Sequence, residues 1–222
     1  MSNSFTTIPR AQRVRQRSQS LWLGFISLVA IWFIVNYAIR YFLPGMPVNP
    51  VQTGLTWARR LTLLAHISAG MVAILVGPWQ FSSALRRNYL RVHRIMGRIY
   101  LAAVGLGGVA ALSLAMTTSL GWAWGFGVGT LAVIWLATSG MALYAIVHKQ
   151  IQAHQAWMRR SYVATFAFVT VRLLGDTPPM SYLQPAQDVL ISTIWMCWAL
   201  PMFALEVIVQ LREFRQHALS GS

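Results

Sequence analysis

The sequence predicts an all-α integral membrane protein, built as a bundle of six transmembrane helices. Residues 99–147 contain no charged side chain, and this stretch is more than twice the roughly 20 residues that a helix needs to cross a bilayer. A short polar segment from Thr117 to Trp122 interrupts it near the middle, which indicates two helices joined by a tight turn. The composition agrees, since 56% of the residues are hydrophobic and 10% are charged, against about 25% charged in soluble domains.

The other apolar stretches give the order of the elements. A basic cytoplasmic tail, residues 1–20, is expected to be disordered and to precede one membrane domain, residues 21–212, which is followed by a second tail, residues 213–222. Prolines mark several boundaries: Pro44 and Pro47 end the first span, Pro178, Pro179 and Pro185 lie in the last loop, and Pro201 is predicted to kink the last span. The expected spans are residues 21–39, 61–81, 99–116, 122–147, 156–174 and 189–211.

The basic residues predict the orientation of the bundle. Six spans place both termini on one side of the membrane, and the positive-inside rule makes the side richer in Arg and Lys cytoplasmic. The outer side carries four basic residues, Arg40, Arg59, Arg60 and Arg172, whereas the terminal side carries fourteen: Arg10, Arg13, Arg15, Arg17, Arg86, Arg87, Arg91, Arg94, Arg98, Lys149, Arg159, Arg160, Arg212 and Arg215. The sequence therefore predicts that both termini are cytoplasmic.

Several function classes are disfavoured. The net charge is +14, but no stretch outside the apolar segments is long enough to fold into a nucleic-acid-binding domain. A single cysteine, Cys197, rules out an intrachain disulfide, and no carboxylate lies near His66, His93 or His154 in the sequence, which disfavours zinc. No nucleophile triad or phosphate-binding loop is present, and the mid-span glycines at 105, 107 and 108 are predicted to pack helices.

Two inner loops carry similar motifs. His93 begins one of them and His154 begins the other, and each histidine is followed five residues later by an arginine and then by a tyrosine. If an ancient duplication relates them, the second and third spans and the fourth and fifth spans form two related helical hairpins, with the histidines in equivalent places. The alternative is independent origin, because every inner loop needs basic residues.

These motifs resemble the signature of a bacterial multi-pass membrane family of unknown function. The matching segments are residues 77–81 (GPWQF), 93–100 (HRIMGRIY), 154–162 (HQAWMRRSY) and 171–173 (VRL), within roughly residues 60–175. One departure is Gln155, where the family pattern has arginine after the histidine, which puts in doubt any role that needs a cation there. The resemblance implies a bacterial inner-membrane location and brings no established activity.

The inner histidines are candidate ligands of haem b. Two neutral imidazoles at similar depth on different helices can hold a haem iron from both faces, and His93 and His154 are expected at such a depth. The residues proposed to bind the haem propionates are Arg94, Arg98, Arg159 and Arg160. Gly97, one turn after His93, would let a flat macrocycle approach the helix. The protein would then pass electrons between a quinone and a membrane-protein partner.

The alternative hypothesis needs no cofactor. Histidines flanked by arginines at a membrane surface commonly contact lipid phosphates and cap helices. On this interpretation the chain is a non-enzymatic membrane component, either an accessory subunit of a complex or a protein that binds a lipid or small solute.

Two further residues are singled out. His66 is expected near the outer surface, some 20 Å from the inner histidines at ~1.5 Å rise per residue, so a second haem there would have a non-histidine partner such as Met116, or no second ligand. Glu206 is the one acid inside an expected span, and we expect it to face the bundle interior. It would either form a buried ion pair with Arg98, Arg159, Arg160 or an inner histidine, or relay protons. A local ion pair is also expected between Arg172 and Asp176.

Overall fold

The computed structural model describes residues 10–43, 56–175 and 186–220, which form helices joined by short turns. The helices are α1 (Arg10–Phe33), continued by a π-helical turn (Ile34–Ala38) and a 3-10 turn (Ile39–Tyr41), then α2 (Trp57–Gln80), α3 (Ser83–Asn88), α4 (Leu90–Met116), α5 (Trp122–Val147), α6 (Ile151–Gly175) and α7 (Ala186–Ser220). No strand occurs in these three ranges. The all-α prediction is confirmed.

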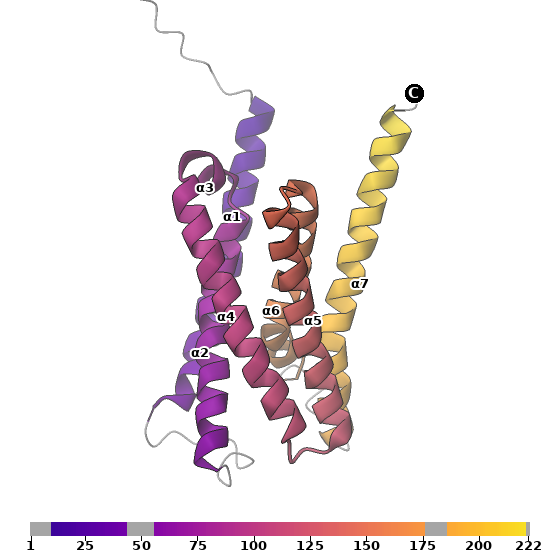
Figure 1. The fold of residues 1–222 in the computed structure, drawn as a ribbon. Coiled ribbons are helices and arrows are strands. Elements are labelled where there is room, and N and C mark those ends of the chain that lie inside the picture. Colours follow the sequence, from indigo (N-terminus) through magenta and orange to yellow (C-terminus); the bar gives the residue numbers. More distant parts are fainter. Residues whose placement is uncertain (1–9, 44–55, 176–185, 221–222) are drawn as a thin grey trace, which may run out of the picture.

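The long helices run up and down a bundle, and α1 begins at the same end at which α7 finishes (Figure 1). α2 packs on α4, α4 on α5, α5 on α6, and α6 in turn contacts α2, so that these four helices close a ring. α7 packs on α6 and α5, and α1 lies against α2. Within the described ranges α4 and α6 share no extensive backbone contact, and they face each other across the centre of the ring.

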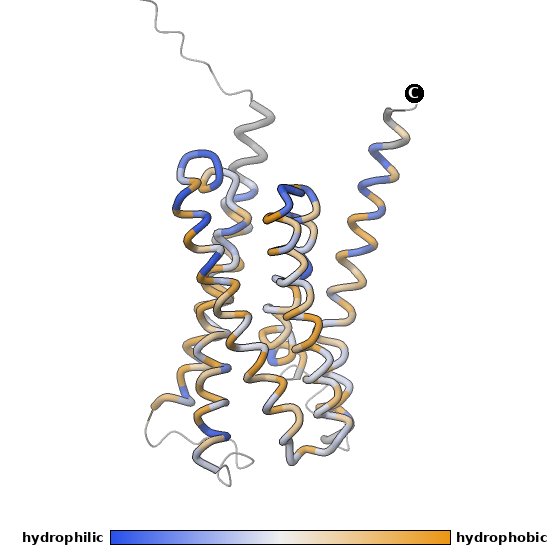
Figure 2. The backbone as a smooth tube through the Cα atoms, viewed as in Figure 1, coloured by the Kyte–Doolittle hydropathy of each residue, from blue (hydrophilic) through white to orange (hydrophobic). Residues whose placement is uncertain are grey.

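Five of these helical segments are long and apolar enough to cross a membrane: Ser18–Tyr41, Trp57–Gln80, Leu90–Met116, Trp122–Val147 and Asp188–Gln216. α6 is the long helix that does not qualify, because Arg159, Arg160 and Arg172 lower its apolar character. It is nevertheless 25 residues long and packs between α5 and α7. Hydrophilic residues gather at the end of the bundle that holds α3 and the turn between α5 and α6 (Figure 2).

The helix limits differ from the sequence expectations at the polar end of the bundle. α1 begins at Arg10 and α4 at Leu90, so that part of the expected disordered tail is helical and His93 lies inside a helix. α7 continues through Pro201 to Ser220 without a break. The short helix α3 was not expected, and its N-cap is Ser82, whose hydroxyl accepts a hydrogen bond from the Leu85 amide at 3.2 Å.

The turn between α4 and α5 confirms the predicted break in the long apolar stretch. Gly121 has φ of 90°, in the region that residues with a Cβ rarely adopt, and α5 begins at the next residue. Small residues allow α4 to approach its neighbours, since a Cβ at Gly107 would lie 3.1 Å from Ala69 and a Cβ at Gly108 would lie 2.6 Å from Leu136. Gly105 has no neighbour within 4 Å of that position, so the expected packing role holds for Gly107 and Gly108 alone.

Candidate functional site

His93 and His154 lie at the same end of the bundle, on the two helices that face each other across its centre. His93 is in the first turn of α4 and His154 in the first turn of α6. His154, Arg86 and Arg94 are close enough to His93 for their charges to act on its ring. The structure therefore brings together the two histidines that the sequence motifs singled out.

The two imidazole rings have different hydrogen-bond environments. Nδ1 of His154 lies 2.8 Å from the carbonyl oxygen of Ala142 on α5. Because a carbonyl only accepts, Nδ1 carries the proton in this bond, and the neutral ring then has a free lone pair on Nε2. Nδ1 of His93 is buried and has no partner among the described residues. Each ring thus keeps at least one nitrogen for which the described residues show no hydrogen-bond partner.

Gln80, the last residue of α2, lies against α4 at Gly97. Its side chain is 6% exposed and its amide nitrogen has no hydrogen-bond partner in the described part of the chain. Its amide oxygen would lie 3.3 Å from a Cβ at Gly97, which is one turn after His93 on α4. Gln80 appears in the sequence motif at residues 77–81, but nothing in the sequence alone connects it to His93.

The arginines near the histidines are in two different situations. Arg160 on α6 makes a bidentate ion pair with Glu206 on α7, with Nε–Oε1 and Nη2–Oε2 distances of 2.6 and 2.8 Å, and its guanidinium lies 5.0 Å from the centre of the Trp157 ring. The Arg160 and Glu206 side chains are 23% and 38% exposed, so Glu206 faces the junction of α6 and α7 rather than the bundle interior. Arg94, Arg98 and Arg159 are exposed.

Glu206 therefore has one of the partners that the sequence allowed, and the ion pair joins α7 to α6. Arg160 is already engaged, which leaves the exposed arginines as the available anion ligands. The expected pair between Arg172 and Asp176 lies outside the described residues, because Asp176 falls in the gap before α7.

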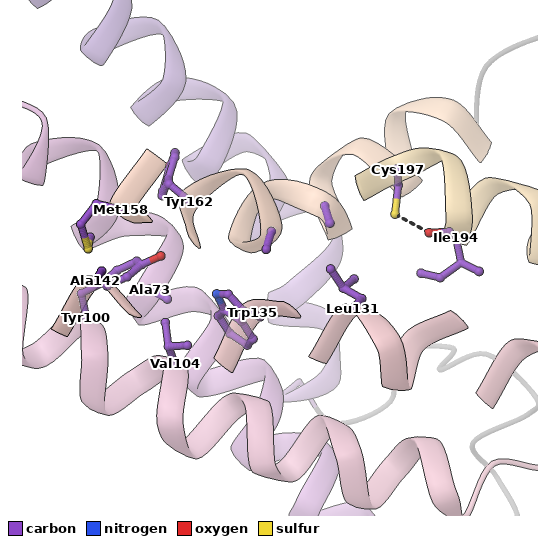
Figure 3. Close-up of a cluster of buried hydrophobic side chains, with 12 residues drawn as sticks. Ala73, Tyr100, Val104, Leu131, Trp135, Ala142, Met158, Tyr162, Ile194 and Cys197 are labelled. Carbon is purple, nitrogen blue, oxygen red and sulfur yellow. Dashed lines mark hydrogen bonds between the residues drawn. The ribbon is translucent and has the colours of Figure 1, made fainter. Parts of the chain in front are cut away.

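A buried hydroxyl network lies beyond the histidines toward the centre of the membrane. The Tyr100 hydroxyl is 2.7 Å from the hydroxyls of both Ser161 and Thr165. The Ser139 hydroxyl is 2.7 Å from that of Ser161, and the Trp135 indole donates to Thr165 at 2.8 Å. Tyr100 is fully buried, and Figure 3 shows its hydroxyl directed toward the indole nitrogen of Trp135. These residues tie α4, α5 and α6 together.

The donors in this network can be assigned by elimination, because each hydroxyl has one proton. Thr165 donates to the Ser161 carbonyl at 2.9 Å and accepts from Trp135, so Tyr100 must donate to Thr165. Ser161 must then donate to Tyr100, and Ser139 to Ser161. Every hydroxyl is satisfied in this arrangement, which is typical of a network that fixes helix positions. The sequence did not reveal it, since single Ser, Thr and Tyr residues in apolar spans carry no recognisable pattern.

His66 lies apart from the inner histidines, near the middle of α2. Its Nδ1 donates to the Gly107 carbonyl of α4 at 2.9 Å, and its ring lies edge-on to Trp135 and Phe168, with ring centres 6.5 and 5.6 Å away. Met116, the suggested partner, is 81% exposed at the end of α4, so it does not face His66. The structure thus provides His66 with packing partners, and Met116 is not one of them.

Other metal sites find no support in the described ranges. No group of three His, Cys, Asp or Glu residues is placed there to hold a metal ion. Cys197 is buried and its thiol donates to the Ile194 carbonyl at 3.0 Å (Figure 3).

Comparison with protein families gives one match. The model of the family described as "Predicted membrane protein (DUF2306)" matches residues 63–209, which is more than half of the chain. The chain belongs to this family. The expected resemblance to a membrane family of unknown function is confirmed, and the matched region contains His66, His93, His154 and Glu206. No curated protein and no solved structure matches the chain.

Proposed function

We propose that this membrane protein binds haem b between His93 and His154 and transfers electrons. The observation that supports the proposal is the placement of the two rings at one end of opposite helices, with Nδ1 of His154 bonded to a carbonyl. Metal-binding histidines usually donate one N–H to a carbonyl or carboxylate and bind the metal through the other nitrogen. Opposite helices of a bundle are a common place for ligands of a central cofactor.

The residues at the site fit the chemistry of haem. Neutral imidazoles are ordinary axial ligands, and the exposed Arg94, Arg98 and Arg159 can pair with propionate groups. Haem would supply reversible one-electron chemistry, and the chain would supply ligation, orientation and charge. A quinone in the bilayer or a membrane-protein partner is the proposed electron donor or acceptor.

We also propose that α6 crosses the membrane as a sixth span, in a bacterial inner membrane, with both termini in the cytoplasm. Two observations support the sixth crossing: α6 runs between α5 and α7, and two of its charged groups have local partners, Arg160 with Glu206 and Arg172 5.6 Å from the Tyr37 ring. The excess of basic residues at the end where α1 begins supports the orientation.

The test of haem binding is a visible spectrum of the full chain, expressed with haem supply and recorded before and after dithionite. We expect a Soret band in the native protein that is lost in both His93→Ala and His154→Ala. His148→Ala is the matched control, because His148 lies at the same end of the bundle but is exposed and bonded to the Tyr144 carbonyl of its own helix. A colourless native protein, or equal loss of haem in the control, would contradict the proposal.

A further inference from the structure

We propose that Arg40 and Arg172 bind the phosphate group of an anionic phospholipid beside the ring of Tyr37. These three residues lie at the end of the bundle opposite to His93 and His154, because α1 and α6 both begin at the polar end and finish at the other one (Figure 1). The lipid site is therefore separate from the proposed haem site and does not depend on it.

An irregular turn holds Tyr37 in a fixed position. Tyr37 belongs to the π-helical turn Ile34–Ala38, which follows α1 and precedes the 3-10 turn that carries Arg40. Short π-helical segments are rare and occur frequently at functional sites. Phe33 stacks on the Tyr37 ring and Trp32 meets it edge-on, with ring centres 5.6 and 5.5 Å away. The ring therefore offers a fixed surface at the end of the helix.

Two guanidinium groups from distant parts of the chain share this ring. Cζ of Arg40 lies 5.9 Å from the ring centre, and Cζ of Arg172, near the end of α6, lies 5.6 Å from it. Each cation is attracted to the ring, but the two positive charges repel each other. The one ion pair in the described ranges joins Arg160 to Glu206, so no described carboxylate neutralises either group. An anion bound to both groups would offset this repulsion.

The depth of the site identifies the anion as a lipid phosphate. Tyr37 and Arg40 are among the last residues of the apolar span Ser18–Tyr41, where a membrane helix reaches the phospholipid headgroups. The side chains of Arg40 and Arg172 are exposed, and guanidinium groups bind phosphate oxygens through paired N–H donors. Two positive charges without a described acid favour a lipid with a net negative charge over a zwitterionic one.

The position of these two arginines needs a cause other than membrane orientation. Under the proposed orientation Arg40 and Arg172 lie on the outer side, where the positive-inside rule disfavours basic residues. The rule explains the arginines at the end that holds His93 but not this pair. A phosphate ligand supplies the missing cause.

The experiment measures lipid binding to the full chain in detergent by native mass spectrometry, with phosphatidylglycerol and phosphatidylcholine as the two probes. The variants are Arg40→Gln, Arg172→Gln and the double variant. Arg60→Gln is the matched control, because Arg60 is an exposed arginine at the same end of the bundle, in the first turn of α2. Inorganic phosphate, added as a competitor, distinguishes a lipid phosphate from a free one.

We expect phosphatidylglycerol to bind more tightly than phosphatidylcholine. Each single variant should weaken phosphatidylglycerol binding by about tenfold, the factor expected for the loss of one charge-assisted hydrogen bond, and Arg60→Gln should leave the affinity unchanged. Inorganic phosphate at the same concentration should not displace the lipid, because it has no acyl chains to contact the helices. If a glutamine variant does not fold, the corresponding lysine variant, which keeps the charge but loses the paired donors, should still weaken binding.

Equal binding of the two lipids, or an equal loss in Arg60→Gln and in the Arg40 and Arg172 variants, would overturn the proposal. Displacement by an equal concentration of inorganic phosphate would overturn the lipid as the source of the anion. Asp176, which lies outside the described residues, is the competing partner of Arg172. Asp176→Asn should leave the lipid affinity unchanged, and a rise in affinity would overturn the role of Arg172 by showing that the carboxylate already occupies its guanidinium.

Discussion

Replacing Gly77 with alanine should destabilise the bundle, because this glycine is where α2 and α6 meet. A Cβ at Gly77 would overlap Cε2 of the Tyr162 ring and approach Cδ2 at 2.5 Å. The ring has little freedom to move away, since its hydroxyl donates to the Ile74 carbonyl at 3.2 Å and its faces and edges contact Phe81 and Phe166, with ring centres 5.6 and 6.0 Å away.

The magnitude follows from three terms. Overpacking of a filled core costs about 1–3 kcal/mol, and the loss of the Tyr162 hydrogen bond adds about 0.6 kcal/mol, the average for such bonds in a membrane. Alanine gains up to about 1 kcal/mol over glycine within a helix. The net loss is therefore about 1–3 kcal/mol, which lowers the equilibrium constant for folding by roughly five- to 150-fold.

Gly70→Ala is the matched control, because Gly70 lies two turns earlier on α2 and has no neighbour within 4 Å of a Cβ. The assay is reversible unfolding in mixed detergent–SDS micelles, followed by tryptophan fluorescence. Gly70→Ala should be neutral or slightly stabilising, and the cost of Gly77→Ala should shrink when Tyr162 is also changed to alanine. Equal stability of Gly77→Ala and Gly70→Ala would refute the packing argument.

Three other predictions concern the network, the ion pair and the orientation. Tyr100→Phe removes two buried hydrogen bonds and should cost about 1–3 kcal/mol in the same unfolding assay, whereas the exposed Tyr89→Phe should cost nothing measurable. Glu206→Leu leaves Arg160 without its ion-pair partner and should lower the free energy of unfolding by on the order of 1 kcal/mol. Glu206→Gln keeps one hydrogen bond and should lower it less. The exposed control Glu213→Leu should be neutral, and equal effects at 206 and 213 would contradict the role of the pair. In a Cys197→Ser background, Ser119→Cys should react with an impermeant maleimide in intact cells, and Asn88→Cys should react only after permeabilisation; the reverse pattern would contradict the proposed orientation.

The sequence predicted the parts of the fold that depend on composition and periodicity. α5 has the expected limits, Trp122–Val147, because a polar turn with Gly121 bounds it on one side and His148 and Lys149 on the other. The apolar stretches predicted starts for α1 and α4 that lie too late in the sequence. Apolar character shows where a helix can contact lipid, but it does not show where the helix begins. Arginine is a good helix former, and Arg91 and Arg94 lie in the part of α4 that extends into the polar zone.

The sequence pointed to the two histidines of the candidate site but not to the groups that surround them. His93 and His154 stand out because each begins a similar motif ahead of an apolar span, with an arginine five residues later. The Ala142 carbonyl could not be found in this way, since a hydrogen bond to a carbonyl on another helix depends on which helices are neighbours. The expectation that Glu206 faces the interior was wrong for the same reason: the position of α7 on the outside of the ring decides where its side chains point.

The hydroxyl network and the two histidines are connected through the same two helices, α4 and α6. His93, Gly97 and Tyr100 lie at spacings of four and three residues on α4, and His154, Met158 and Ser161 repeat the same spacings on α6, so each set lies on one helix face. Seven residues of helix separate each histidine from the bond between Tyr100 and Ser161, a distance of about 10 Å. Because helices resist bending over two turns, the 2.7 Å bond between those hydroxyls also restricts how far the two helix ends that carry the imidazoles can move apart. Loss of the Tyr100 hydroxyl should therefore weaken the binding of any ligand held between His93 and His154.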